Sequence, residues 1–230
     1  MTSELCGALP EELRLWLESI GERSFRVDQI LSWVHKKGVL DPASMTNLSK
    51  SLREKLETDW ENEPATIGDV ACSSDGTRKL RFDFKAGGAV ETVLIPEGDK
   101  LTQCISTQVG CAFRCRFCLS GSRGLERNLT TGEIMAQIVM GRAHWEENER
   151  LTNIVVMGSG EPLANFDATA AAVRLLTDDK ATGLSTRRVT VSTIGLPKGI
   201  ERLGREFDGQ IGLAVSLHGP DDETRGKLLP

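Results

Sequence analysis

The chain has 230 residues, a formal net charge of −5, and 39% hydrophobic and 27% charged residues. This length can bury a substantial core, as one large domain or two unequal ones. The composition is that of a globular protein, and no apolar run approaches the roughly 20 residues that span a bilayer. The N-terminus has no basic region followed by an apolar block, which excludes a secretory signal and predicts a cytoplasmic protein. The negative charge argues against nucleic-acid binding by bulk attraction alone.

The first part of the chain, residues 1–63, is predicted to be a small helical domain without a catalytic role. Segments 10–21, 25–38 and 45–60 place apolar side chains at helical spacing, and the first two end at a glycine. Phe25 is expected to lie on the apolar side of the second segment.

Residues 64–100 contain turn signals between alternating segments, which predict a short antiparallel β unit. From residue 101 to 230, strand-like runs alternate with helix-like runs, which predicts an α/β fold with a parallel sheet or partial barrel. Such sheets bind ligands at the carboxyl ends of their strands. Four strands are too few to close an eight-stranded barrel, and the chain ends after a strand-and-loop segment. The strand-like runs are 103–108, 153–158, 188–193 and 211–218, and the helix-like runs are 131–145, 168–179 and 196–206.

The strongest chemical signal is CAFRCRFC, in which Cys111, Cys115 and Cys118 follow a strand. Three thiolates in one loop can ligate three irons of a cubane cluster and leave the fourth iron open. The alternative is a zinc site, which usually needs four ligands, and Cys104 could supply the fourth. The chain has three histidines, none close to this motif. We expect His35 to be a packing or surface residue rather than a ligand.

The second signal is the turn MGSGEP, about forty residues downstream at the end of a strand-like run. Its glycines, Gly158 and Gly160, would let the backbone approach a ligand, and Glu161 could bind the amino group of a cofactor. Two later strand ends carry polar tips, which suggests one shared pocket, although each tip alone is typical of a capping residue. These tips are Ser192 and Thr193, then Ser216 and His218.

Two residues upstream of the cysteine motif are further candidates. Cys104 is close enough in sequence to share the site of Cys111, or is a buried strand cysteine. Glu91 lies in a predicted strand, where a solvated carboxylate is the ordinary interpretation. Four arginines within and after the motif could bind phosphate although the chain as a whole is acidic, or they could be solvated surface residues. They are Arg114, Arg116, Arg123 and Arg127.

The three-cysteine loop resembles the radical S-adenosylmethionine (SAM) superfamily, and its context resembles the RlmN-type RNA methyltransferases. The matching segments run through nearly the whole chain and include GERSFRVDQILSWVHKKG, CISTQVGCAFRCRFC, MGSGEPLAN and AVSLHGPDDETR. The resemblance implies a helical accessory domain before an incomplete (β/α)6 barrel of the radical SAM type.

The resemblance also implies site residues. Cys111, Cys115 and Cys118 would hold a [4Fe–4S] cluster that binds SAM. Glu91 would accept a proton, and Cys104 would be the resolving cysteine, which forms a disulfide with a methyl-carrying cysteine to free the product. The SAM pocket would be lined by Gly160, Glu161, Ser192, Ser216, Leu217 and His218.

The implied reaction is methylation of carbon 2 of an adenine in 23S rRNA, with tRNA as a further substrate. An electron donor such as flavodoxin or ferredoxin is implied, and we expect a monomer. The family's methyl-carrying cysteine would lie beyond position 230, and no cysteine follows Cys118. We therefore expect a C-terminally truncated, inactive fragment. The alternatives are Cfr-type methylation of carbon 8 and a non-catalytic, zinc-stabilised RNA-binding domain.

Overall fold

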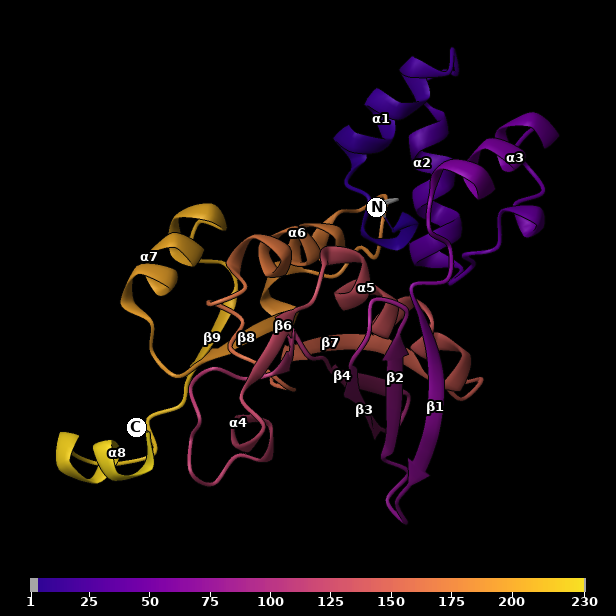
Figure 1. Ribbon diagram of the computed structural model, residues 1–230. Coiled ribbons are helices and arrows are strands. Elements are labelled where there is room, and N and C mark those ends of the chain that lie inside the picture. The colour runs from indigo at the N-terminus through magenta and orange to yellow at the C-terminus, as the bar shows by residue number, and fades with distance from the viewer. Residues whose placement is uncertain (1–3, 230) are drawn as a thin grey trace.

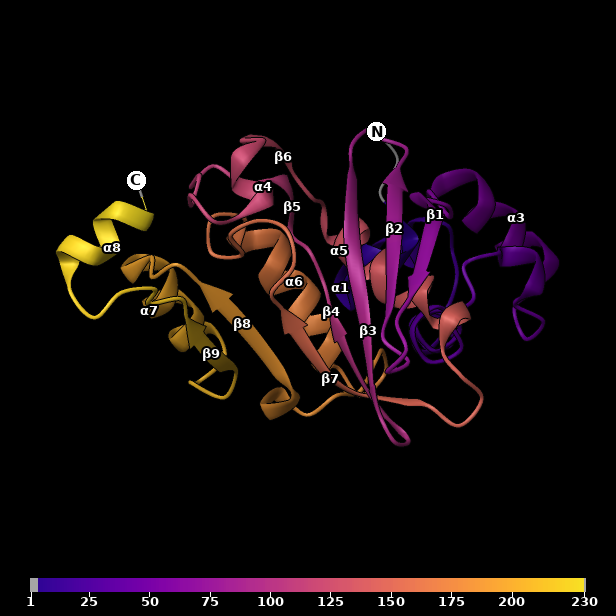
Figure 2. The same cartoon turned by 90° about the horizontal axis from the view of Figure 1, so that it is seen from below.

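The computed structural model describes residues 4–229, and its central feature is one seven-stranded mixed sheet (Figure 1). The strands lie in the order β1-β2-β3-β4-β7-β8-β9. The steps from β1 to β4 are antiparallel, and β4, β7, β8 and β9 are parallel. Figure 2 shows these strands as an open arc. The predicted α/β fold with a partial barrel is thus confirmed. The bounds are β1 Ala65–Cys72, β2 Arg78–Phe84, β3 Ala89–Glu97, β4 Lys100–Cys104, β7 Arg150–Val156, β8 Val189–Thr193 and β9 Gly212–Val215.

The antiparallel strands predicted for residues 64–100 are present, and they belong to the same sheet as the parallel strands. The hydrogen bonding passes from β3 to β4 and from β4 to β7 without interruption. The domain boundaries after residues 63 and 100 stay a prediction. No helix within the described residues is long and apolar enough to cross a membrane.

Helices α5 (Thr131–Val139) and α6 (Phe166–Thr177) pack against one face of the sheet (Figures 1 and 2). Thr130 caps α5, because its hydroxyl accepts from the Glu133 N–H while the Glu133 carboxylate accepts from the Thr130 N–H. Every residue from Gly132 to Val139 is buried, since α5 also contacts the N-terminal segment at Leu5–Gly7. The polar residues of this helix therefore need partners inside the protein.

The remaining elements lie toward the C-terminus and around the cysteine motif. Strands β5 (Gln108–Gly110) and β6 (Leu125–Asn128) form a separate two-stranded sheet, and α4 (Leu119–Ser122) lies between them in sequence. Helix α7 (Pro197–Glu206) matches its prediction. The sequence predicted only a strand and a loop at the end of the chain, whereas a short helix, α8 (Asp222–Leu228), also follows β9. Asp221 caps it by accepting from the Thr224 N–H.

The N-terminal helices are α1 (Pro10–Ser19), α2 (Arg26–Leu31) and α3 (Lys50–Asp59). Their apolar stripes share one core, which contains Leu13, Leu17, Ile30, Leu52 and Leu56. A π-helical turn, Ser32–Lys36, continues α2. Helix α3 begins later than predicted, because Ser49 caps it. The placement of Phe25 on the apolar side was wrong: it precedes the first turn of α2, is 50% exposed, and stacks under the Arg26 guanidinium.

His35 lies in the π-helical turn and is a packing residue, as expected. It is buried, and within the described residues neither ring nitrogen has a hydrogen-bond partner. Burial lowers the pKa of His35 from 6.5 to about 4, although the charge of Asp178 acts in the opposite direction. The folded protein therefore holds a neutral imidazole at a pH where the unfolded chain is already protonated.

We expect the free energy of unfolding to fall by about 2 kcal/mol between pH 7.5 and pH 5 because of His35 alone. The folded pKa is depressed, so the contribution is complete above about pH 6.5 and is lost as the pH falls toward 4. Urea unfolding at both pH values checks this, with His35→Gln as the matched control that cannot titrate. An equal pH dependence in both proteins would contradict the prediction.

Candidate active site

The two faces of the sheet carry different side chains because strand residues alternate in direction. Thr92 on β3 and Gln103 on β4 hydrogen-bond to Gln137 of α5, so they lie on the helix-covered face. The opposite face, called the inner face below, therefore holds Glu91 and Cys104. Register extends this face along the parallel strands, since Cys104 pairs with Val155, Val155 with Thr190 and Ser192 with Ala214.

Glu91 and Cys104 are diagonal neighbours on the inner face. Val93 lies directly opposite Cys104 in the antiparallel β3–β4 pair, and Glu91 is two residues from Val93. The Glu91 side chain is 57% exposed, and its carboxylate lies 2.9 Å from the Lys79 Nζ on β2. Cys104 is half-buried, and burial raises the pKa of its thiol. A solvated carboxylate and a protected thiol thus share one surface.

The cysteine loop is held beside the sheet by β5 and β6. The Cys111 N–H donates to the Gly124 carbonyl, and the Cys118 N–H donates to the Cys115 carbonyl. A Cβ on Gly121 would lie 3.0 Å from the Cys115 nitrogen, so the loop wraps tightly around this glycine. Arg114, at the centre of the loop, has a φ of 49°, which is uncommon for a residue with a side chain.

The three thiols of the loop suit a group that binds sulfur as thiolate. Burial raises the pKa of Cys111 and Cys115, and the neighbouring cysteine charges raise both pKa values further. A cationic cluster bound by the three thiolates would offset this repulsion. All six cysteines of the chain are free thiols. Among residues 4–229, no three Cys, His, Asp or Glu side chains have the spacing of a single-ion site.

The glycines of the MGSGEP turn accommodate the protein's own loop. A Cβ on Gly158 would lie 2.4 Å from the Ser106 Oγ, and one on Gly160 would lie 2.6 Å from the Gln108 Cβ. Gly160 also has a φ of 105°. The close approach predicted for these glycines therefore exists, but its partner is the segment between Cys104 and the cysteine motif.

Glu161 of this turn connects the ends of two strands. It is 2% exposed, and its carboxylate oxygens accept from the Leu163 N–H at 3.0 Å and the Ile194 N–H at 2.8 Å. Ile194 directly follows β8, so the carboxylate ties the turn after β7 to the end of the next strand. Its own N–H donates to the Gln108 side chain at 2.8 Å.

The ends of β8 and β9 complete this edge of the sheet. Ser192 and Ser216 are half-buried, while Leu217 and His218 are exposed. The His218 ring lies 4.6 Å from the Phe117 ring of the cysteine loop, measured between centroids. The structure thus brings the cysteine loop, the MGSGEP turn and the predicted strand ends together along one edge.

Arg225 of α8 is a residue of this edge that the sequence did not indicate. Its guanidinium donates to the carbonyls of Ser216 and Leu217, at 2.9 and 2.7 Å, and to that of Ile194. The only sequence signal was its place in the segment DDETR, which resembled the family without suggesting a contact. It therefore joins the ends of β8 and β9, and it binds the carbonyl of Ile194, whose N–H donates to Glu161.

Three of the four arginines near the cysteine motif remain exposed. Arg114, Arg116 and Arg123 form no ion pair with the described carboxylates, so they can face an anionic partner. Arg127 was wrongly grouped with them. It binds both oxygens of the buried Glu133 carboxylate at 2.7 Å and donates to the Gly87 carbonyl.

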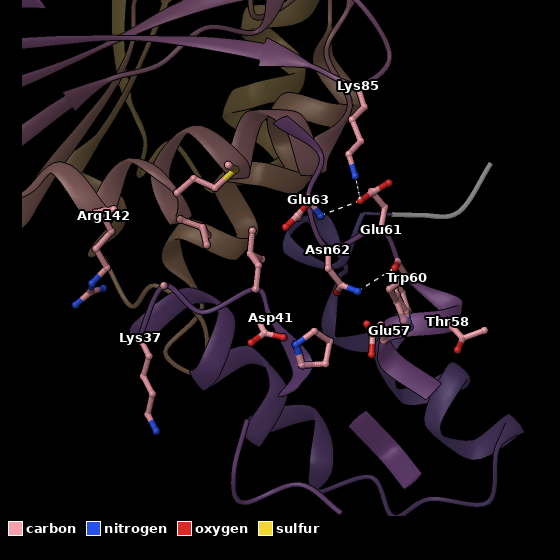
Figure 3. Close-up of a pocket in the computed structure, with 16 residues that line it drawn as sticks. Lys37, Asp41, Glu57, Thr58, Trp60, Glu61, Asn62, Glu63, Lys85 and Arg142 are labelled. Carbon is pink, nitrogen blue, oxygen red and sulfur yellow. Dashed lines mark hydrogen bonds and ion pairs between the residues drawn. The ribbon is translucent and has the colours of Figure 1, made fainter. Parts of the chain in front are cut away.

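A large pocket lies away from this edge, between the N-terminal helices and the end of α5 (Figure 3). Its volume is about 980 Å³. None of the predicted site residues lines it. Its charges are mixed, with Lys37, Lys85 and Arg142 among several carboxylates, and Lys85 pairs with Glu61 at 2.9 Å. This balance does not select a ligand class.

Comparison with known families bears on the alternatives for the cysteine loop. The model of the radical SAM superfamily matches residues 105–229. The chain belongs to this superfamily. A second model, the ribosomal RNA large subunit methyltransferase N-terminal domain, matches residues 3–61. Membership of this superfamily implies a [4Fe–4S] cluster and SAM, and it favours the cluster over the zinc site.

Individual relatives are consistent with this assignment. The chain is 48% identical to a dual-specificity RNA methyltransferase RlmN of Sorangium cellulosum, over 96% of this chain and 66% of the relative. It is 44% identical to the Marinobacter nauticus protein of the same name, over 98% of this chain and 62% of that relative. A crystal structure of a radical SAM methyltransferase from Sphaerobacter thermophilus superposes with a TM-score of 0.93 at 42% identity, covering 99% of this chain and 67% of that one. The chain thus spans about two thirds of the length of these relatives.

Proposed function

We propose that this chain holds the catalytic centre of a radical SAM methyltransferase that modifies carbon 2 of an adenine in 23S rRNA, with tRNA as a further substrate. The observation that carries the proposal is the shared inner face. Cys104 and Glu91 are diagonal neighbours there, and the chain runs from the end of β4 at Cys104 through β5 to the cysteine loop. A zinc-stabilised binding domain would need neither a protected thiol nor a carboxylate at this position.

Cys111, Cys115 and Cys118 would hold the [4Fe–4S] cluster, which supplies reductive cleavage of SAM when bound. Gly160 and Glu161, Ser192, and Ser216 through His218 would line the SAM pocket at the strand ends. Glu91 would accept the proton from the methylated ring carbon. For this step, the ion pair between its carboxylate and Lys79 must break at least in part. The Cys104 thiolate would attack the sulfur of the methyl-carrying cysteine. The bond between that sulfur and the transferred carbon would break as the disulfide forms, and the carbon would take up a proton, which completes the methyl group and frees the product.

The substrate fits the exposed charges of the cysteine loop. Arg114, Arg116 and Arg123 can contact RNA phosphates beside the inner face, although the chain as a whole is acidic. The proposal includes an external one-electron donor such as flavodoxin or ferredoxin, and a monomeric enzyme.

The test is methylation of unmodified 23S rRNA by anaerobically reconstituted protein with SAM and a reductant. We expect no product from the 230 residues alone. The proposed mechanism needs a methyl-carrying cysteine, and no cysteine follows Cys118 in these residues. A chimera that continues after position 230 with the C-terminal third of the Sorangium cellulosum relative should form 2-methyladenosine, measured by mass spectrometry. Cys104→Ala in the chimera should instead accumulate a covalent RNA–protein adduct.

Two outcomes would contradict the proposal. Formation of 8-methyladenosine would assign the chain to the alternative carbon-8 chemistry. Product from the 230 residues alone would show that the mechanism uses a different methyl carrier.

A further inference from the structure

Gln137 of α5 is fully buried, and every hydrogen-bonding position of its side chain is used. Its Oε1 accepts from the Thr92 hydroxyl and from the Ser106 N–H, both at 2.8 Å. Its Nε2 donates to the Ser106 carbonyl at 2.9 Å and to the Glu133 carbonyl at 3.3 Å. An amide has two acceptor and two donor positions, so the side chain is saturated. Gln137 therefore clamps both backbone polar groups of Ser106.

Ser106 in turn joins two segments of the candidate site. Its hydroxyl donates to the Glu91 carbonyl on β3 at 2.8 Å and accepts from the Ser159 N–H in the MGSGEP turn at 2.9 Å. The backbone on either side adds further bonds to the turn, since the Gly158 N–H donates to the Ile105 carbonyl and the Thr107 N–H donates to the Ser159 carbonyl. Ser106 is itself only 1% exposed and lies two residues after Cys104.

These contacts connect β3, the segment that directly follows β4, and the turn after β7 at a single buried point. An apolar residue at position 137 could fill the same space, yet it would leave the Ser106 N–H and carbonyl unpaired. A buried polar network that is fully satisfied specifies one geometry of the segments that it joins. The segments joined here are those of Glu91, Cys104 and the MGSGEP turn.

We propose that Gln137 and Ser106 are positioning residues, which set the placement of Cys104 relative to Glu91 and to the MGSGEP turn. The inference deepens the proposed function, on which the roles of these three elements rest. A base and a thiol that act on one bound intermediate must be aligned closely, and an error of about 1 Å can cost about a hundredfold in rate.

The test uses the metal-free chain, so that its outcome does not depend on methylation. Iodoacetamide labelling, followed at each cysteine by mass spectrometry across pH, reports the local environment of each thiol. Cys72 is exposed and serves as the internal standard, whereas Cys6 is fully buried and reports global opening. Ser106→Ala and Gln137→Met should raise labelling of Cys104 about tenfold, because two or more buried hydrogen bonds are lost.

Three features separate positioning from a loss of stability. The pH profile of Cys104 labelling should move toward that of a solvated thiol. In the native protein, burial raises the pKa of Cys104, and its charged neighbour on the inner face is the ion pair between Glu91 and Lys79. Labelling of Cys6 should stay unchanged. Thr92→Val removes one bond to Gln137 but none to Ser106, so it should lower the urea midpoint while Cys104 labelling stays unchanged.

An unchanged Cys104 profile in Ser106→Ala and Gln137→Met would overturn the inference, as would a parallel rise at Cys6. If the labelling result holds while the chimera fails to methylate RNA, the positioning of Cys104 stands and the proposed function fails.

Discussion

Replacing any one of Cys111, Cys115 and Cys118 by alanine should reduce the iron content of anaerobically reconstituted protein from about four per chain to near zero. Each thiolate would bind a different iron, so the loss of one leaves two irons without a protein ligand. The loop cannot easily recruit a substitute, because β5, β6 and the close contact at Gly121 hold its backbone. Iron and sulfide analysis and the visible absorption spectrum measure the effect.

Three further cysteines provide matched controls for this prediction. Cys72→Ala should retain the cluster, since Cys72 is exposed at the end of β1. Cys6→Ala should also retain it, at some cost in stability, because the buried Cys6 thiol donates to the Gly132 carbonyl. Cys104→Ala distinguishes a three-cysteine cluster from a four-cysteine site. A loss of iron in Cys104→Ala or Cys72→Ala equal to that in Cys111→Ala would refute the ligand assignment.

The parallel strands could be predicted from sequence because each has apolar side chains at alternating positions and polar residues at its end. Ile154 and Val156 on β7, and Val189 and Val191 on β8, are all buried against the helices. The cysteine motif was equally clear, since its spacing alone restricts the chemistry. The strand order β1-β2-β3-β4-β7 was not accessible, because pairing between distant segments depends on tertiary contacts that no local pattern encodes.

The polar connections of the site were missed for a related reason. In sequence, Gln137 is an ordinary polar residue of an amphipathic helix, and Ser106 is one of several hydroxyls after a strand. Only burial shows that both need partners inside the protein. The same applies to Gly158 and Gly160, whose small size indicated a close contact without indicating which atoms approach.

Glu161→Ala should weaken SAM binding at least about tenfold and lower the free energy of unfolding by about 3 kcal/mol, while the cluster is retained. The substitution leaves the N–H groups of the buried Leu163 and the half-buried Ile194 without their carboxylate acceptor. Each charge-assisted bond of this kind contributes about 1.5–3 kcal/mol. The SAM pocket should suffer because the turn after β7 and the end of β8 lose their common anchor.

Calorimetric titration of SAM into cluster-loaded protein, together with urea unfolding, measures both effects. Glu147→Ala is the matched control, because that carboxylate is exposed and has no hydrogen-bond or ion-pair partner within residues 4–229. Glu161→Gln should be intermediate, since its amide retains one acceptor oxygen but presents an NH₂ group to the second buried N–H. Unchanged SAM affinity in Glu161→Ala would show that the strand ends keep their shape without this carboxylate, and would remove Glu161 from the cofactor site.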